Sequence, residues 1–251
     1  MEEDKIKRLV RLLKRLDAGE SSSDIRKEQC GFLATIEPKD ICLAEQDLIM
    51  AGMTIEDMQH MCSRHIQILG DQTNKLRESL PSAHVLRMIL CEHDMLKCFL
   101  VDLLDVNRTI QEINYITSTS SEFRKLSHIV HHLLAANQHY EREEQIIFPE
   151  LERRGYFGPL EILRKEHFDL KENVDQLKEL VDNCCVMNFA EFRLKLDETA
   201  NSVVSTSREH IALEDNILYP TALEVVDDES MWSRMKAMCD EIGYCCFRHD
   251  F

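Results

Sequence analysis

The chain has 251 residues, of which 44% are hydrophobic, and it contains only 7 Gly and 5 Pro. This length fits one large domain, or one domain with a small addition. Long segments rich in helix-forming residues and poor in turn signals predict an all-α fold. A formal net charge of −16 argues against a nucleic-acid-binding surface, which needs clustered Lys and Arg. The same acidity fits a protein that gathers carboxylates for cations.

The sequence contains no run of apolar residues long enough to predict a membrane-spanning segment. Its start, MEEDKIKRLVRLLKRLDAGE, is typical of a charged amphipathic helix and has no apolar secretory core. The ten cysteines are therefore expected to be reduced, most of them as small buried hydrophobic residues, which predicts a cytoplasmic location. No role follows from the adjacent pairs Cys184 with Cys185 and Cys245 with Cys246.

Residues 1–75 predict a small domain of four short helices. The segments are IKRLVRLLKRLDAG, which stops at Gly19, SSSDIRKEQCGFLATI, which opens on cap residues, PKDICLAEQDLIMAG, from Pro38 to Gly52, and TIEDMQHMCSRHIQILG, from a Thr54 cap to Gly70. Such residues begin and end helices because they pair or relieve the free backbone groups there. The polar stretch DQTNKLRESLPS then predicts a connection to a second domain.

Four longer helical patterns predict an up-down-up-down four-helix bundle over residues 82–226. They cover about 82–114, 120–154, 159–184 and 189–226, and the segments TSTSS, GYFGP and CCVMN separate them. Short connections of this kind place successive helices antiparallel to each other. A last helix, ESMWSRMKAMCDEIG, lies in the C-terminal segment 228–251.

Two of the long helices carry nearly the same motif. HYEREEQIIFPELE begins at His139 and HIALEDNILYPTALE begins at His210, each with Glu four residues later and Pro ten residues later. Four residues of an α-helix turn through about 400°, so His139 with Glu143, and His210 with Glu214, lie on one face and can bind one cation together. An apolar residue seven positions after each His shares this face, which predicts that it points inward.

The other two long helices carry a second repeated histidine. CEHDML contains His93 and KEHFDL contains His167, 74 residues apart (167 − 93), close to the 71 residues (210 − 139) between the longer motifs. The bundle is therefore interpreted as two copies of one helical hairpin, which bring four imidazoles and two carboxylates to one level. A single His-x-x-x-Glu pair is usually exposed, and a lone buried His is usually structural. Repetition of both at one period favours a metal site.

The donor set predicts a pair of metal ions. Four neutral nitrogens and two anionic oxygens suit two iron or manganese ions, whereas a structural zinc site takes four donors and often thiolates. The charges of Glu143 and Glu214 would compensate the cations inside an apolar bundle. The acids that follow them, Glu144 and Asp215, could each replace the preceding glutamate as a ligand, although a step of five residues turns through about 500° and places them less squarely behind the His.

Residues 82–226 resemble the hemerythrin-like (HHE cation-binding) family of di-iron four-helix bundles, and especially its branch of iron–sulfur-cluster repair proteins. The ligand set that this resemblance implies is His93, His139, Glu143, His167, His210 and Glu214. It implies two iron ions with an oxo or hydroxo bridge, with manganese or zinc as alternatives. The oxygen carriers of the family have a further histidine four residues along the third helix, where this chain has Lys171. Its absence removes one nitrogen ligand, argues against stoichiometric oxygen carriage, and leaves a coordination position for water, oxo, oxygen or nitric oxide.

Residues 13–65 resemble an uncharacterised helical domain that precedes hemerythrin-like domains in prokaryotic proteins, which implies a bacterial or archaeal cytoplasmic protein. The two resemblances together predict a non-haem di-iron protein that binds or reacts with oxygen, nitric oxide or peroxide in stress sensing, scavenging or iron-centre repair. The alternative is a regulatory module in which the metal is structural and the N-terminal helices contact a protein partner. Whether the protein is an enzyme stays open.

Several histidines lie outside the repeated pattern. His128, His131 and His132 precede the second-helix motif, and they are interpreted as a solvated end of the bundle or as groups near an entry path. His84 lies nine residues before His93, about 180° round a continuous helix. It should face away from the metal site unless that helix begins late.

One further motif, CSRH, places Cys62 and His65 three residues apart on a predicted helix. This spacing can bind a metal, although one such pair without partners is a weak signal. The pair is interpreted either as an outside ligand or redox thiol near the di-metal site, or as no site at all.

Overall fold

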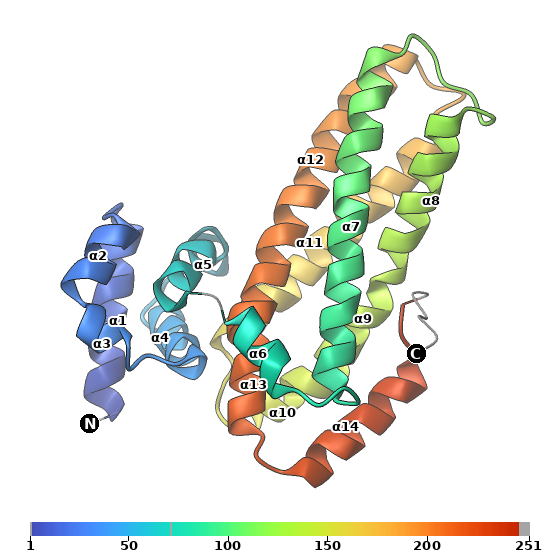
Figure 1. Ribbon diagram of the computed structural model, residues 1–251. Helices are drawn as coiled ribbons and strands as arrows, with labels where there is room; N and C mark the ends of the chain where they lie inside the picture. Colours follow the sequence, from blue (N-terminus) through green and yellow to red (C-terminus); the bar gives the residue numbers. More distant parts are fainter. Residues whose placement is uncertain (1, 71, 246–251) are drawn as a thin grey trace.

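The structure is a computed structural model that describes residues 2–70 and 72–245 (Figure 1). Every regular element among these residues is a helix, which confirms the all-α prediction. Within the same ranges, no helix combines the length and the apolar character needed to cross a bilayer. Cys246, one of the paired cysteines noted above, lies outside the described residues.

The N-terminal part of the described chain consists of short helices. They are α1 (Glu2–Asp17), α2 (Ser22–Glu28), α3 (Cys30–Leu33), α4 (Pro38–Met50), α5 (Ile55–Leu69) and α6 (Thr73–Ser79). Gly19 and Gly52 end α1 and α4 with φ of 92° and 99°, a conformation that only glycine adopts readily. Thr54 caps α5 by accepting a hydrogen bond from the Asp57 N–H at 3.1 Å. The predicted helix ends are therefore present.

Helix α6 replaces the connection that the sequence predicted between the two domains. Leu76, the one apolar residue of this helix, is buried in the core. Arg77 donates hydrogen bonds to the carbonyl of Leu90 and to Asp94. This polar stretch is anchored because its leucine joins the core and its arginine bonds to α7, the next helix. The segment after Ser21 also differs from the prediction, since Gln29 separates α2 from α3.

The bundle contains the four expected antiparallel rods (Figure 1). Their elements are α7 (Val85–Glu112), then α8 (Ser121–Ala135), α9 (Asn137–Arg142), η1 (Glu143–Ile147) and α10 (Phe148–Glu152), then α11 (Gly158–Asn183), and finally α12 (Phe189–Leu213), η2 (Glu214–Leu218) and α13 (Tyr219–Val225). Helix α14 (Glu229–Ile242) crosses the end of the bundle and contacts α7, α9 and η1. The sequence predicted the second rod as one helix, but it is broken at Ala136. Just before the break, the Ala135 carbonyl accepts a hydrogen bond from the Cys245 thiol at 3.1 Å.

The second and fourth rods each widen into a π-helical segment of five residues, η1 and η2. These begin at Glu143 and Glu214, whose carbonyls accept from the N–H five residues later. Pro149 or Pro220 follows each segment. Proline has no N–H to donate, and its ring crowds the carbonyl four residues earlier, so a wider turn relieves that contact. The prediction of continuous α-helices was wrong at both places.

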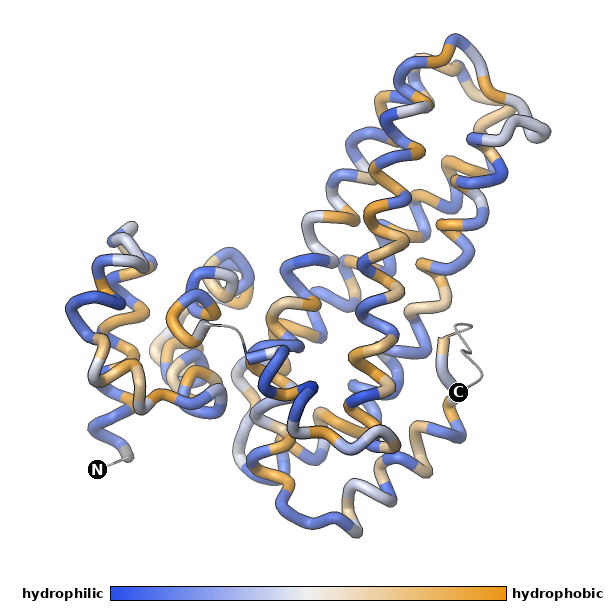
Figure 2. Tube along the Cα trace, in the orientation of Figure 1, coloured by the Kyte–Doolittle hydropathy of each residue, from blue (hydrophilic) through white to orange (hydrophobic). Residues whose placement is uncertain are grey.

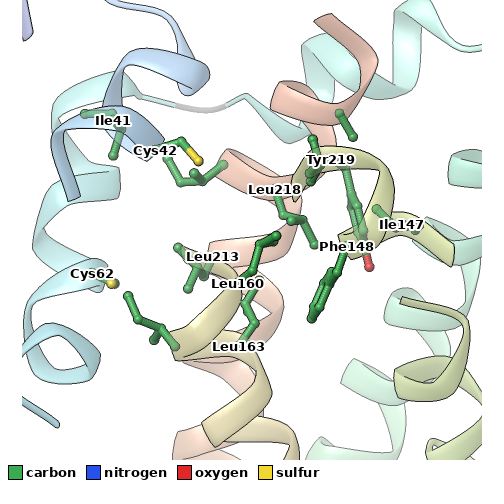
Figure 3. Packing of buried hydrophobic residues seen from close by; sticks show 14 of the residues in the cluster. Ile41, Cys42, Cys62, Ile147, Phe148, Leu160, Leu163, Leu213, Leu218 and Tyr219 are labelled. Atoms are coloured by element: carbon green, nitrogen blue, oxygen red, sulfur yellow. The ribbon is translucent and has the colours of Figure 1, made fainter. Parts of the chain in front are cut away.

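A polar layer divides the hydrophobic core. On one side, a cluster joins the N-terminal helices, α14 and the near end of the bundle, and Figure 3 shows part of it between Ile41 and Phe148. On the other side, a second cluster fills the far half of the bundle, where apolar positions follow the inner sides of the rods in Figure 2. On α7 the gap between the clusters runs from Leu90 to Leu96 and contains His93.

The N-terminal helices pack directly on the bundle. The Gln46 side chain of α4 accepts a hydrogen bond from the N–H of Phe157 at 3.1 Å. At Gly158 an added Cβ would lie 2.7 Å from the Gln46 Cα, so only glycine allows α4 and α11 to come this close. The two parts of the chain therefore share one core across this contact.

Candidate metal centre

The six side chains predicted as metal ligands meet in the polar layer. They are His93 on α7, His139 on α9, Glu143 at the start of η1, His167 on α11, His210 on α12 and Glu214 at the start of η2. None is more than 2% exposed. Burial of two carboxylates and four imidazoles is costly unless they are paired or bind cations. Their convergence is therefore a site rather than a surface cluster.

Glu214 lies at the centre of this site. Its Oε2 is 3.1 Å from Nε2 of His93 and 3.9 Å from Nε2 of His139. Its Oε1 is 2.9 Å from Nε2 of His210 and 3.6 Å from Nε2 of His167. Donors that share one cation at about 2.0–2.2 Å are separated by roughly 2.8–3.6 Å. The carboxylate is thus placed to bridge two cations, one on each side.

Glu143 occupies the second central position. Its Oε2 is 3.5 Å from Nε2 of His139 and 3.3 Å from Nε2 of His167. Its other oxygen accepts a hydrogen bond from the hydroxyl of Tyr219, which is fully buried. Tyr219 was not singled out from the sequence. The signal was its place in the repeated (I/L)(F/Y)P tail, where the other copy has Phe148, which lacks a hydroxyl.

Each histidine is held from behind by a carboxylate. The pairs at Nδ1 are His93 with Asp215 at 2.6 Å, His139 with Glu92 at 3.0 Å, His167 with Glu144 at 2.6 Å, and His210 with Glu166 at 2.8 Å. A carboxylate at Nδ1 keeps the ring proton there, so the Nε2 lone pair faces the centre. Metal-binding histidines commonly have this arrangement.

The outer carboxylates follow the internal duplication. Glu92 and Glu166, which precede the histidines of the two EH dipeptides, pair with His139 and His210 of their own hairpins. Glu144 and Asp215, which follow the two motif glutamates, pair with His167 and His93 of the opposite hairpins. Glu144 and Asp215 therefore orient imidazoles, which corrects their reading as replacement ligands. Glu92 and Glu166 were missed, although the repeated EH dipeptide was a signal for them.

Several inward-facing atoms at the centre have no hydrogen-bond partner. Among the described residues, those buried without a hydrogen bond include Glu143 Oε2, both carboxylate oxygens of Glu214, and Nε2 of His167 and His210. Each unpaired buried polar group costs about 1–3 kcal/mol. At this centre, two groups of donors are each close enough to hold one ion. The first group is Glu143, His167, His210 and Glu214, and the second is His93, His139 and Glu214. The donor set fits two cations that share Glu214.

The ionisation of the site follows from its charges. Burial alone lowers the pKa of His93, but the neighbouring Asp215 and Glu214 carboxylates outweigh burial and raise this pKa to about 10. Burial raises the pKa of Glu92, but His139 and Arg142 lower it to about 2. The outer carboxylate is therefore anionic, and a cation must displace protons from the imidazoles.

A small cavity opens beside the centre. Its volume is about 20 Å³, which is room for one water-sized molecule. Three of the histidines, Glu214, Tyr140 and Ser207 line it, and the aliphatic part of the lining consists of Leu96, Leu100, Leu133, Ala136, Val174 and Ile211. The cavity can therefore admit a small neutral molecule next to the predicted ligands.

Lys171 stands where the oxygen carriers have a further histidine, and its amine points to the edge of the site. Its Nζ lies 4.0 Å from Glu144 Oε1 and 5.7 Å from the centre of the Tyr140 ring. Tyr140 in turn stacks on His167, with ring centres 4.3 Å apart. Lys171 thus supports the pair of Glu144 and His167.

The remaining predicted histidines lie elsewhere. His128 and His131 are exposed, and His132 stacks on Phe99 with ring centres 4.6 Å apart. None of the three belongs to a donor group found within the described ranges. His128 and His131 lie on a solvated face of α8, and His132 is half-buried against Phe99.

His84 caps a helix. The residue precedes α7, and its Nδ1 accepts a hydrogen bond from the Leu86 N–H at 3.2 Å. Its ring packs on Trp232, with centres 4.6 Å apart. The helix does begin later than residue 82, but the imidazole is used for the cap, so His84 is not placed as a ligand.

We expect Tyr219→Phe to weaken metal binding about 10- to 100-fold, because Glu143 loses the hydroxyl that orients it. The fold should persist, since the other copy of the repeat already has phenylalanine in this place. Chelator competition measures the affinity, and circular dichroism checks the fold. Tyr115→Phe, at a side chain that is 73% exposed, is the control. An unchanged affinity in Tyr219→Phe would show that this hydroxyl does not position Glu143.

Comparison with known families agrees with the geometry. The family described as Hemerythrin HHE cation binding domain matches residues 84–222, more than half of the chain. Residues 9–75 match a family of unknown function, DUF438. Both resemblances stated from the sequence are thereby confirmed.

Curated relatives match part of the chain. A probable iron-sulfur cluster repair protein of Haemophilus influenzae is 34% identical over 91 residues, which cover 35% of this chain and 41% of that protein. The iron-sulfur cluster repair protein YtfE of Salmonella paratyphi B is 33% identical over 91 residues, with the same coverage. The match spans less than half the length of these relatives. The family assignment rests on the longer match, and by it the chain belongs to the hemerythrin HHE cation binding domain family.

Proposed function

We propose that the protein holds two iron ions between Glu143 and Glu214 and meets a small oxidant (oxygen, nitric oxide or peroxide) in stress-related protection or repair of iron centres. The observation that carries this is the position of Glu214, whose two oxygens make no hydrogen bond and lie near Nε2 atoms from all four rods of the bundle. The relatives named for iron-sulfur cluster repair support the repair setting.

A pair of adjacent ferrous ions can supply two electrons to one small oxidant. The protein contributes the surroundings of this chemistry. The outer carboxylates hold each imidazole with Nε2 inward, and Tyr219 holds Glu143. The apolar wall of the cavity limits entry to small neutral molecules. A protein partner for the N-terminal helices and a reducing cytoplasmic setting belong to the same proposal.

The competing function is a regulatory module in which the metal only stabilises the bundle. One observation favours it, because the hydrophobic core is continuous from the N-terminal helices to the end of the bundle next to the centre. Metal loss could then alter the surface that a partner contacts, without any reaction at the centre.

Anaerobic loading with ferrous iron, followed by separate exposure to oxygen and nitric oxide, distinguishes the two functions. We expect about two irons per chain and a change in the visible spectrum with at least one of the gases. Zinc-loaded protein is the control, since zinc has no redox chemistry. If chelation unfolds the protein while both gases leave the iron spectrum unchanged, the metal is structural.

A further inference from the structure

Four chemically active side chains from three N-terminal helices meet outside the bundle centre. Asp17 ends α1, Glu45 lies on α4, and Cys62 and His65 lie on α5. Glu45 and His65 are 0% exposed and Cys62 is 3% exposed. The His65 ring lies between two carboxylates, with Nδ1 at 2.8 Å from Glu45 Oε1 and Nε2 at 3.1 Å from Asp17 Oδ1. This cluster takes no part in the site described above.

An ion pair alone leaves the cluster unsatisfied. Glu45 Oε2 and Asp17 Oδ2 are buried and have no hydrogen-bond partner within the described chain. A ligand atom of Glu45, the Cys62 sulfur and a His65 nitrogen all lie within 4.8 Å of one another. One cation among these three would pair the free oxygen of Glu45. A fully buried carboxylate oxygen beside a thiol and an imidazole is therefore a second, independent sign of a ligand.

We propose that Cys62 Sγ, His65 Nδ1 and the Glu45 carboxylate form a second metal site for one divalent ion of the zinc type, with a water molecule as the fourth donor. The spacing of three residues places Cys62 and His65 on one face of α5. Thiolate with imidazole favours zinc or a similar transition metal over calcium or magnesium, which prefer oxygen donors alone. Asp17 holds the proton of His65 Nε2 and so directs Nδ1 to the metal.

A redox role for Cys62 fits the surroundings less well. Burial raises the pKa of this thiol well above its usual value, and the charges of Glu45 and Glu166 raise it further. A buried protonated thiol is a poor nucleophile. A metal ion reverses this, since the sulfur–metal bond replaces the S–H bond and the proton passes to solvent.

The second site lies where the N-terminal helices meet the bundle. Figure 3 places Cys62 on the side of α5 that faces Leu163 and Leu213. Glu166, whose charge reaches Cys62, also bonds to His210 of the bundle centre. A metal bound here would fasten α4 and α5 next to α11. The site goes beyond the proposed function and does not depend on it.

Cobalt(II) loading of the full-length protein tests this site, because the six donors proposed at the bundle centre contain no sulfur. We expect a thiolate-to-cobalt charge-transfer band in the near ultraviolet. Cys62→Ser should remove the band, while Cys42→Ser should retain it. Cys42 is the matched control, since it is also buried and near Glu45 but lies outside the donor group.

The same experiment in a Glu143→Ala, Glu214→Ala background separates the two sites. The band should persist there, so failure of the bundle centre and failure of the second site give different results. Absence of the band from folded wild-type protein overturns the proposal, and so does an unchanged band in Cys62→Ser. If Cys62→Ser does not fold, Glu45→Gln decides. This isosteric change should weaken cobalt binding at least tenfold, and unchanged binding counts against the site.

Discussion

Glu214→Ala should bind about one iron ion or fewer per chain, where we expect the unchanged protein to bind about two. The residue is within 3.9 Å of a nitrogen of each of the four predicted histidines, so its loss removes a donor from both cations at once. Without the shared anion, the two cations also repel each other across a buried space. We expect affinity for the second ion to fall more than about 100-fold. Metal analysis after dialysis, with chelator competition, measures both effects.

Two variants calibrate this result. Glu143→Ala should have a smaller effect, because Glu143 lies near two of the histidines rather than four. Glu141→Ala changes an exposed residue of α9, the helix that leads into Glu143, and should bind metal like the unchanged protein. Retention of both ions at full affinity by Glu214→Ala would refute the assignment of Glu214 as the bridging ligand.

Arg142→Ala should reduce the free energy of unfolding by about 3–5 kcal/mol, because it removes the guanidinium from one half of a buried ion pair with Glu92. The arginine is 0% exposed. It donates to Glu92, which also holds His139, and to the carbonyl of Gly243 after α14. One side chain therefore links the candidate metal centre to the C-terminal helix. Chemical denaturation of the metal-loaded protein measures the loss.

The controls separate charge from packing. Arg208→Ala removes an exposed arginine and should change stability by less than about 0.5 kcal/mol. The double variant Glu92→Gln, Arg142→Met removes both charges and should be more stable than Arg142→Ala alone. A loss below about 1 kcal/mol in Arg142→Ala would mean that the Glu92 charge is compensated in another way.

Local patterns in the sequence were enough to predict the helical class, most helix ends and the six residues that converge. Gly19, Gly52 and Thr54 act through their own backbone or through a neighbour three residues away, so they can be read without a fold. The repeated His-x-x-x-Glu motif works in the same way, because helical periodicity alone puts the two side chains on one face. Duplication then supplied the pairing of the hairpins, since equal halves place equal residues at equal depth.

The tertiary structure alone decided the partners of these residues. Asp215 holds the ring of His93 from 122 positions away, and the Cys245 N–H donates to Glu92 across 153 positions. The same is true of Glu45 and Asp17 around His65, and of the contact between Arg77 of α6 and the Leu90 carbonyl of α7. Such pairs form between residues that packing brings together from distant parts of the chain. The spacing of residues within one helix does not predict these contacts. The sequence therefore determined which atoms face inward, and packing determined which atoms they meet.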